Sequence, residues 1–211
     1  MPIYNEINAL ARQFADRLGE QTEARVLEME GDDDGHYLIY RVLGVAHEEG
    51  RLIDVYQNKG RFLYKYAGSF LEQAAKLCFQ HRYEDAAPLR IPNTLGTKPK
   101  LFEIDCLVEG RIAHEVKWRD ATTDGDHITK EHTRLQVIKD AGFLPVRVMF
   151  YYPNRAQAQR IQRTLQTLYV GVGGEYYFGD AAWEYINRMT GVNLLDILER
   201  IAAERGVEGG L

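Results

Sequence analysis

Long hydrophobic runs and cysteines are scarce in this chain of 211 residues. No run approaches the length of a membrane span, and no apolar segment follows a charged start as in a secretion signal. We therefore expect a cytoplasmic protein without a membrane partner. The two cysteines, Cys78 and Cys106, lie far apart and outside any CxxC pattern, which favours reduced core thiols over a disulfide or a zinc site.

An excess of positive charge, the usual mark of a nucleic-acid-binding protein, is also missing. The formal net charge is −5. Its distribution is uneven, because residues 1–50 hold 11 acidic and 4 basic residues, whereas residues 51–211 hold 20 acidic and 22 basic ones. The overall charge is therefore compatible with DNA binding without indicating it.

The order of the predicted elements indicates one α/β domain over residues 1–211. With 45% hydrophobic residues, the chain is long enough for one real core. We expect a helical and strand-containing part at 1–50, a core at 66–152 and a helical part at 153–211. Hydrophobic periodicity, together with the positions of glycine and proline, predicts the elements. Before residue 101 these are one or two helices at 5–30, strands at 37–45 and 52–57, a helix at 69–80 and a loop at 84–100. After residue 127 they are a helix at 128–141, a strand at 143–152, a helix at 154–168, a glycine-rich break at 171–174 and a helical region at 180–205.

The stretch 101–119 predicts two neighbouring strands that carry acids on one face. Alternate residues of 101–108 are apolar, which leaves Glu103 and Asp105 on the other face. Glu109-Gly110 is a plausible tight turn, and 111–119 alternates again. If the strands pair as a hairpin, Asp105, Glu115 and Lys117 converge.

Two carboxylates and an ammonium suit a hydrolytic site with a divalent metal. Asp105 and Glu115 would hold a hard cation such as Mg²⁺, with the carbonyl of Val116 as a third ligand. Lys117 would orient or deprotonate a water and offset phosphate charge. The alternative is a surface hairpin whose Glu115 and Lys117 are ordinary cross-strand charges. A zinc-protease site is excluded, because HEVK is not HExxH.

Two further acidic features have two interpretations each. Ser69-x-x-Glu72 fits a capping box at a helix start, but Glu72 could instead face the site as an additional acid. The acids of Gly31-Asp-Asp-Asp-Gly35 fit a solvated turn, with a metal-binding loop as the less favoured alternative. His114 shares an apolar strand face and is interpreted as a packed core histidine.

Candidate DNA contacts follow the second strand and lie in the proline-rich loop. The polar stretch after Lys117 is either a loop with a helix N-cap at Thr123 or Asp126, or a set of contacts to base edges and phosphates. The candidates there are Arg119, Asp120, Thr122, Thr123, Asp124, Asp126, His127 and Lys130. In the loop at 84–100, Lys98 and Lys100 could lie along a phosphate backbone.

Asp105…Glu115-x-Lys117 on a hairpin between helices resembles the PD-(D/E)xK nuclease core. The strings YRVLGV, GRFLYKYAGSFLEQAAKLCF, EIDCLV and HEVKWRDATTDGDHITKEHTRLQ resemble the ApaLI-like type II restriction endonucleases, over roughly residues 35–200. The resemblance implies a restriction-endonuclease-like core with a mixed central β-sheet flanked by helices. It also implies a Mg²⁺-dependent homodimer that cuts double-stranded DNA at a short palindrome. Ile104 stands where the superfamily name has proline, a position that serves only backbone shape.

Two other functions remain open at this point. One is a less specific repair or junction-resolving nuclease of the same fold, and the other is a DNA-binding protein without hydrolysis. The intact set of Asp105, Glu115 and Lys117 counts against the second. For a homodimer, the aromatic and aliphatic residues of 175–200 could supply an interface.

Overall fold

The computed structural model describes residues 2–119 and 125–206, and the side chains of 125–127 are not described. The chain divides into two compact units. One comprises residues 8–70, and the other comprises residues 1–7 and 71–211. Within the described ranges, no helix is long and apolar enough to cross a lipid bilayer.

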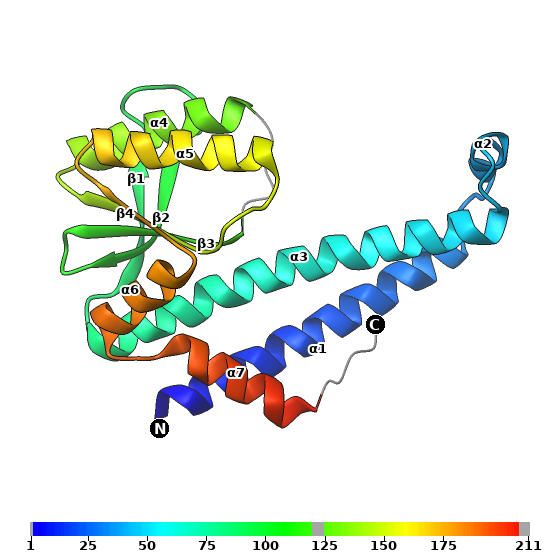
Figure 1. The fold of residues 1–211 in the computed structure, drawn as a ribbon, viewed down its shortest axis with the longest axis horizontal. Helices are drawn as coiled ribbons and strands as arrows, with labels where there is room; N and C mark the ends of the chain where they lie inside the picture. The colour runs from blue at the N-terminus through cyan, green and yellow to red at the C-terminus, as the bar shows by residue number, and fades with distance from the viewer. Residues whose placement is uncertain (1, 120–124, 207–211) are drawn as a thin grey trace. The chain divides into compact units, whose positions relative to one another are not determined.

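The first unit, residues 8–70, is a helical hairpin made by α1 (Pro2–Glu30) and α3 (His47–Arg82), with the short α2 (Tyr37–Val42) between them. The two long helices run side by side (Figure 1), where Phe14 makes edge-on ring contacts with Tyr66 and Phe70. The predicted helix at 5–30 is therefore confirmed as one helix.

Three predictions for the region 37–80 are wrong. The stretches expected as strands at 37–45 and 52–57 form α2 and the first part of α3. No neighbouring strand is described beside either stretch, so their backbone groups bond locally within helices. Ser69 lies inside the 36-residue α3, so it begins no helix and the capping-box interpretation of Glu72 fails.

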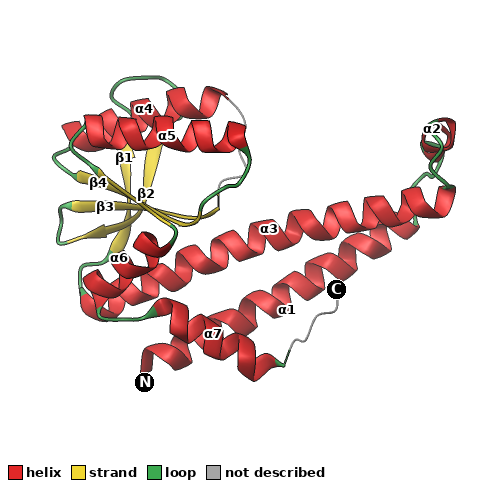
Figure 2. Ribbon diagram, viewed as in Figure 1, coloured by secondary structure: helices red, strands yellow, loops and turns green. Residues whose placement is uncertain are grey.

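The second unit is built on a sheet whose described strands number five, in the order β1 (Ala87–Pro92), β2 (Leu101–Val108), β3 (Ile112–Arg119), β4 (Leu144–Tyr151) and β5 (Glu175–Phe178). β1, β2 and β3 pair antiparallel, whereas β3, β4 and β5 pair parallel. Figure 2 shows this sheet between helices. The predicted α/β class with a mixed sheet flanked by helices is confirmed.

Helices α4 (Gly125–Asp140) and α5 (Ala156–Gly171) lie side by side on one face of the sheet (Figure 1). On the other face, α6 (Asp180–Thr190) brings Tyr185 to His114 of β3, whose ring also contacts Phe79 of α3. α7 (Leu194–Arg205) follows α6 after a left-handed Gly191. The helical region expected at 180–205 thus consists of two helices.

Two strands were not predicted. The stretch 84–100, expected to be only a loop, contains β1, whose prolines Pro88 and Pro92 are tolerated because β1 is an edge strand. β5 follows the glycine-rich break, where an added Cβ on Gly174 would come within 2.5 Å of the Pro145 carbonyl oxygen. Glycine therefore permits the chain to pass close to the start of β4 before it enters the sheet.

The predicted hairpin at 101–119 is confirmed. Phe102, Ile104, Cys106 and Val108 are all buried, as their alternation indicated. Glu109 and Gly110 both have positive φ at the turn. The helix predicted at 128–141 is α4, which ends at Asp140 and is followed by Gly142 with a φ of +82°. One hydrophobic cluster joins residues from β1, β2, β3 and α4, namely Ile91, Phe102, Ile104, Ala113, Val137 and Ile138.

Candidate active site

The site forms where β2 and β3 stop pairing. Their backbone register runs from Val108–Ile112 to Cys106–His114 and ends there. One step further, Asp105 would lie opposite Glu115. Instead of a backbone pair, the amide of Val116 donates to Oδ2 of Asp105 at 2.8 Å. The carboxylate of Asp105 is therefore anchored at the point where the two strands separate.

Asp105, Glu115 and Lys117 are brought together, as the strand pattern predicted. Nζ of Lys117 lies 2.5 Å from Oε1 of Glu115 and 3.9 Å from Oδ2 of Asp105. Both acids are only 9% exposed. Two carboxylates in a poorly solvated place require compensating positive charge, from side chains or from a bound cation.

The two acids respond differently to this environment. Burial and the charge of Glu115 raise the pKa of Asp105 to about 7. Burial would also raise the pKa of Glu115, but Arg134 and Lys117 outweigh it and lower that pKa to about 2. Asp105 has Lys117 as its ion-pair partner at 3.9 Å, whereas Glu115 has both Lys117 and Arg134, so the charge of Asp105 is the less compensated of the two. Carboxylate oxygens such as these are the ligands that hard cations prefer.

Glu72 lies on the part of α3 that belongs to this second unit. Its charge contributes to the raised pKa of Asp105, so it is close enough to influence the site. Its Oε1 pairs with Nζ of Lys76 at 2.9 Å. Glu72 therefore remains a candidate additional acid of the site, with Lys76 as its ion-pair partner.

A buried ion network behind Glu115 was not found from the sequence. Arg134 of α4 donates to Oε2 of Glu115 and, at 3.1 Å, to Oε1 of Glu131. That same oxygen accepts from Arg147 of β4 at 3.3 Å and from the hydroxyl of Tyr169 of α5 at 2.7 Å. The network therefore ties Glu115 to two helices and a neighbouring strand.

The sequence did contain a signal for this network. Glu131 and Arg134 interrupt the apolar positions of the helix at 128–141, and Arg147 is the one charge in the apolar strand at 143–152. A charge in a position that should be buried needs a partner. Charges in apolar patterns on several elements thus indicate an internal ion network.

His114 is a packed core histidine, as predicted. Its Nδ1 donates to the carbonyl of Cys106 at 3.1 Å, so Nε2 accepts from the hydroxyl of Tyr185 at 2.8 Å. Burial lowers its pKa to about 4, which keeps the ring neutral. Cys78 and Cys106 are buried and free, and burial raises the pKa of each thiol to about 12.

The predicted DNA contacts are only partly described. Arg119 ends β3 and stacks over Trp118, with 5.7 Å between the guanidinium carbon and the ring centroid. Lys98, Lys100 and Lys130 are exposed. Asp120, Thr122, Thr123 and Asp124 lie outside the described residues, as do the side chains of Asp126 and His127 and any N-cap of α4.

A hollow of about 540 Å³ lies beside Arg119, at the carboxyl ends of β3 and β4. It is lined by Trp118, Arg119, Tyr151, Tyr152, Pro153, Asn154 and Arg155. Tyr151, the last residue of β4, is exposed there. Aromatic faces and guanidinium groups together can take bases and phosphates.

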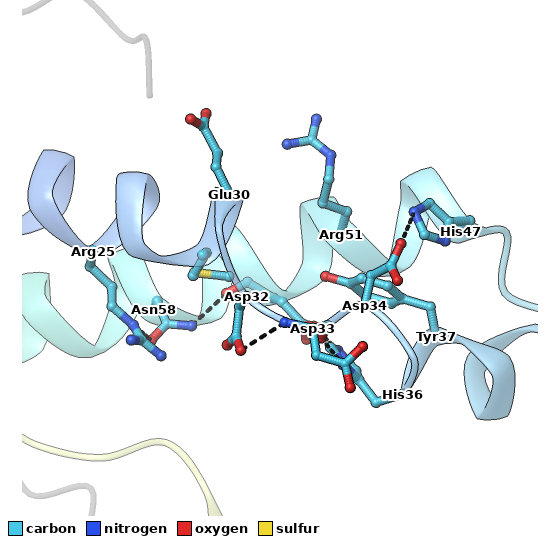
Figure 3. A pocket seen from close by; sticks show the side chains of 12 residues that line it. Arg25, Glu30, Asp32, Asp33, Asp34, His36, Tyr37, His47, Arg51 and Asn58 are labelled. Carbon is cyan, nitrogen blue, oxygen red and sulfur yellow. Dashed lines mark hydrogen bonds and ion pairs between the residues drawn. The ribbon is translucent and has the colours of Figure 1, made fainter.

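The acidic turn at 31–35 belongs to the helical hairpin and forms a separate pocket of about 410 Å³ (Figure 3). Two side-chain hydrogen bonds close the turn. The carboxylate of Asp32 accepts from the amide of Asp33, and the carboxylate of Asp33 accepts from the amide of Gly35. Asp34 faces His47 at 3.8 Å, and Asp54 faces His36 at 3.1 Å. Among the residues with described placement, no group of three or more His, Cys, Asp or Glu side chains could hold a metal. The structure therefore gives the metal-loop alternative no support.

Comparison with known proteins identifies the family of this chain. The family model described as ApaLI-like restriction endonuclease matches residues 1–203. The chain belongs to that family. No curated protein and no solved structure matches it. Family membership identifies a restriction endonuclease, an enzyme that acts on DNA, and it extends the resemblance noted for residues 35–200 to nearly the whole chain.

Proposed function

We propose that this family member is a Mg²⁺-dependent type II enzyme of the PD-(D/E)xK kind, which hydrolyses phosphodiester bonds in double-stranded DNA at a short palindromic site. The supporting observation is the convergence of Asp105, Glu115 and Lys117 where β2 and β3 separate. In this proposal residues 1–211 work as one nuclease domain, in the cytoplasm with the DNA.

The roles follow from the donor chemistry of the site. Oxygens of Asp105 and Glu115, with the carbonyl of Val116, would hold Mg²⁺, which stabilises negative charge on a phosphate and acidifies a bound water. Lys117 is half-exposed and can reach a water or a phosphate oxygen. Glu72 would add negative charge behind Asp105.

DNA would be held beside this site by the hollow and by exposed lysines. Arg119 and Arg155 can contact phosphates, and Tyr151 offers an exposed aromatic face. Lys98, Lys100 and Lys130 supply further positive charge. The same role is proposed for Asp120, Thr122, Thr123, Asp124, Asp126 and His127, which follow Arg119 directly in the chain.

A digest of one long, fully sequenced DNA tests the activity. The purified protein should give discrete bands with Mg²⁺ and none with EDTA. Asp105→Ala, Glu115→Ala and Lys117→Ala should each slow cutting by at least about 100-fold, because each removes a group that acts on the reacting phosphate or water. Rates are read from the loss of intact DNA on a gel.

Lys139→Ala provides the matched control, since Lys139 is an exposed lysine of α4. It should cut at the parent rate. Normal cutting by any of the three site variants would refute the site assignment. A smear would favour the less specific nuclease, whereas DNA that is bound but left intact would favour a binding protein.

A palindromic target entails a homodimer, and the helical hairpin offers the best-supported surface for the dimer interface. In 175–200, the region suggested by the sequence, the apolar side chains of Phe178 and Ala181 are exposed, and the other apolar side chains are buried or half-buried. By contrast, α2 and one stripe of α3 expose apolar side chains, namely Leu38, Ile39, Val42, Leu43, Leu52, Ile53, Tyr56, Leu63 and Tyr64. An exposed apolar surface of this kind marks an interaction site.

The charges along α3 fit a second copy of the chain as the partner. Acids Glu48 and Glu49 lie at its start, and Lys59, Arg61 and Lys65 follow further along. Two copies of α3 packed antiparallel across a two-fold axis would face acidic segments with basic ones. We therefore propose that this stripe mediates dimerisation.

Analytical ultracentrifugation of the full chain tests this interface. The parent protein should sediment as a dimer, and the double change Ile53→Asp with Tyr56→Asp should weaken association by at least about 100-fold, because it buries two unpaired charges. Leu27→Asp, on the exposed face of α1, is the control and should remain dimeric. A dimer that survives the double change would place the interface elsewhere.

A further inference from the structure

Both carboxylate oxygens of Glu115 are already engaged by cationic side chains. Oε1 lies 2.5 Å from Nζ of Lys117, and Oε2 accepts from Arg134. Glu115 is one of the two acids proposed to hold a divalent cation. A cation that binds it must therefore displace one of these partners.

Arg134 is the partner that cannot leave easily. Its NH1 donates to Glu131, and its NH2 also donates to the backbone carbonyl of Glu103 at 3.1 Å. Its side chain is 9% exposed. Withdrawing Arg134 would leave Glu131 with one fewer donor in a buried place, which is costly.

Lys117 is held much less firmly. Among the residues that the structure describes, its ion pairs are with the two acids, Glu115 at 2.5 Å and Asp105 at 3.9 Å. Its side chain is 35% exposed, so the ammonium has a short path to water. The lysine chain is flexible, and its charge is a compact, strongly hydrated point. Lys117 can therefore leave Oε1 without leaving a buried charge of its own unpaired.

The charge balance around Asp105 and Glu115 also favours replacement of a cationic side chain by the metal over simple addition of the metal. At pH 8, where Asp105 is largely ionised, Asp105, Glu115 and Glu131 carry three negative charges, and Lys117, Arg134 and Arg147 carry three positive ones. The cluster is balanced with no metal. An added dication would give it an excess of positive charge unless a cationic side chain withdrew.

We propose that the Lys117 ammonium is an exchangeable counter-ion. It holds Asp105 and Glu115 together in the metal-free protein and withdraws from Oε1 when a divalent cation binds, while Arg134 keeps Oε2. This inference rests on the proposed metal-dependent function and adds an order of events to it. The ammonium, once released, is free to approach the phosphate or its water.

Calcium titration of the metal-free full chain at pH 8, followed by calorimetry, tests the exchange without DNA cleavage. Lys117→Met keeps the length of the side chain and removes its charge. Its dissociation constant for Ca²⁺ should be at least about 10-fold lower than that of the parent, because the competing ammonium is gone. Lys117→Gln should show the same lower dissociation constant, and it replaces the methionine variant if that variant folds poorly.

Lys139→Met is the matched control, because Lys139 is an exposed lysine in the last turn of α4. The change removes the same charge from the same unit and should alter the dissociation constant by less than about two-fold. Equal tightening in both variants would overturn the exchange in favour of a general charge effect.

Glu115→Gln identifies the site being titrated and should abolish binding. Calcium binding that persists in Glu115→Gln would refute the assignment, as would Lys117 variants that bind no more tightly than the parent. Failure of the exchange alone leaves a parent protein that binds metal and cuts DNA. A parent that neither binds Ca²⁺ nor cuts DNA with Mg²⁺ would overturn the proposed function as well.

Discussion

Replacing Glu131 with alanine is expected to lower the free energy of unfolding by about 3–5 kcal/mol. One oxygen of Glu131 accepts from Arg134, Arg147 and Tyr169, all of which are buried. Without it, two guanidinium groups lose their shared anion in a place that water reaches poorly. The change is measured by urea unfolding followed by circular dichroism.

Two further variants make this expectation specific. Glu131→Gln keeps the shape but not the charge, so it should be destabilising by a smaller amount. Glu199→Ala removes an exposed glutamate of α7 and should stay within about 0.5 kcal/mol of the parent. A loss below about 1 kcal/mol for Glu131→Ala would mean that the network contributes little net stability.

Replacing Asp105 with asparagine should have opposite effects on stability and activity. The pKa of Asp105 is about 7 in the folded protein, well above the ordinary value of 3.8 for an aspartate. The folded state therefore retains a proton that the unfolded chain has released, and ionising this carboxyl opposes folding at higher pH. Asp105→Asn should stabilise the metal-free protein at pH 8 by on the order of 3 kcal/mol, while cutting is lost.

The pH dependence of stability tests whether the pKa of Asp105 is raised in the folded protein. The favourable contribution of the protonated carboxyl is fully present below pH 4 and is lost as the pH rises through about 7. The advantage of Asp105→Asn should thus be largest at pH 8 and should vanish towards pH 4, in urea unfolding with EDTA. Asp16→Asn, on exposed α1, should differ from the parent by less than about 0.5 kcal/mol at each pH. A pH-independent gain would contradict the raised pKa.

These two expectations share a physical cause. The site collects three acids and three cations in a poorly solvated place, and each acid depends on the cations nearest to it. Glu115 has two cationic partners and Glu131 has two, whereas Asp105 has a backbone amide and a lysine 3.9 Å away. Asp105 is therefore the member of the cluster whose charge is most dependent on a further cation.

Much of the candidate site was predictable because its signals are local. A strand repeats every two residues, so the alternation in 101–119 was enough to predict two strands and the acids between them. Their convergence needed only a tight turn at 109–110. The helix at 128–141 followed from its periodicity in the same way.

The tertiary structure decided what depends on distant partners. The apolar residues of 37–45 and 52–57 have strand propensity, but a strand needs a neighbour, and here they form helices of a hairpin. β1 and β5 are strands because β2 and β4 offer free edges to them, in spite of prolines and glycines nearby. Local propensity could not reveal these pairings.

The α/β class, the family and the convergence of the three candidate site residues could thus be predicted from the sequence. Only the tertiary structure determined how their charges are balanced, because Glu131, Arg147 and Tyr169 come from three elements that meet behind Glu115. Pairing between buried charges depends on distance and solvation, which sequence spacing does not encode across separate elements.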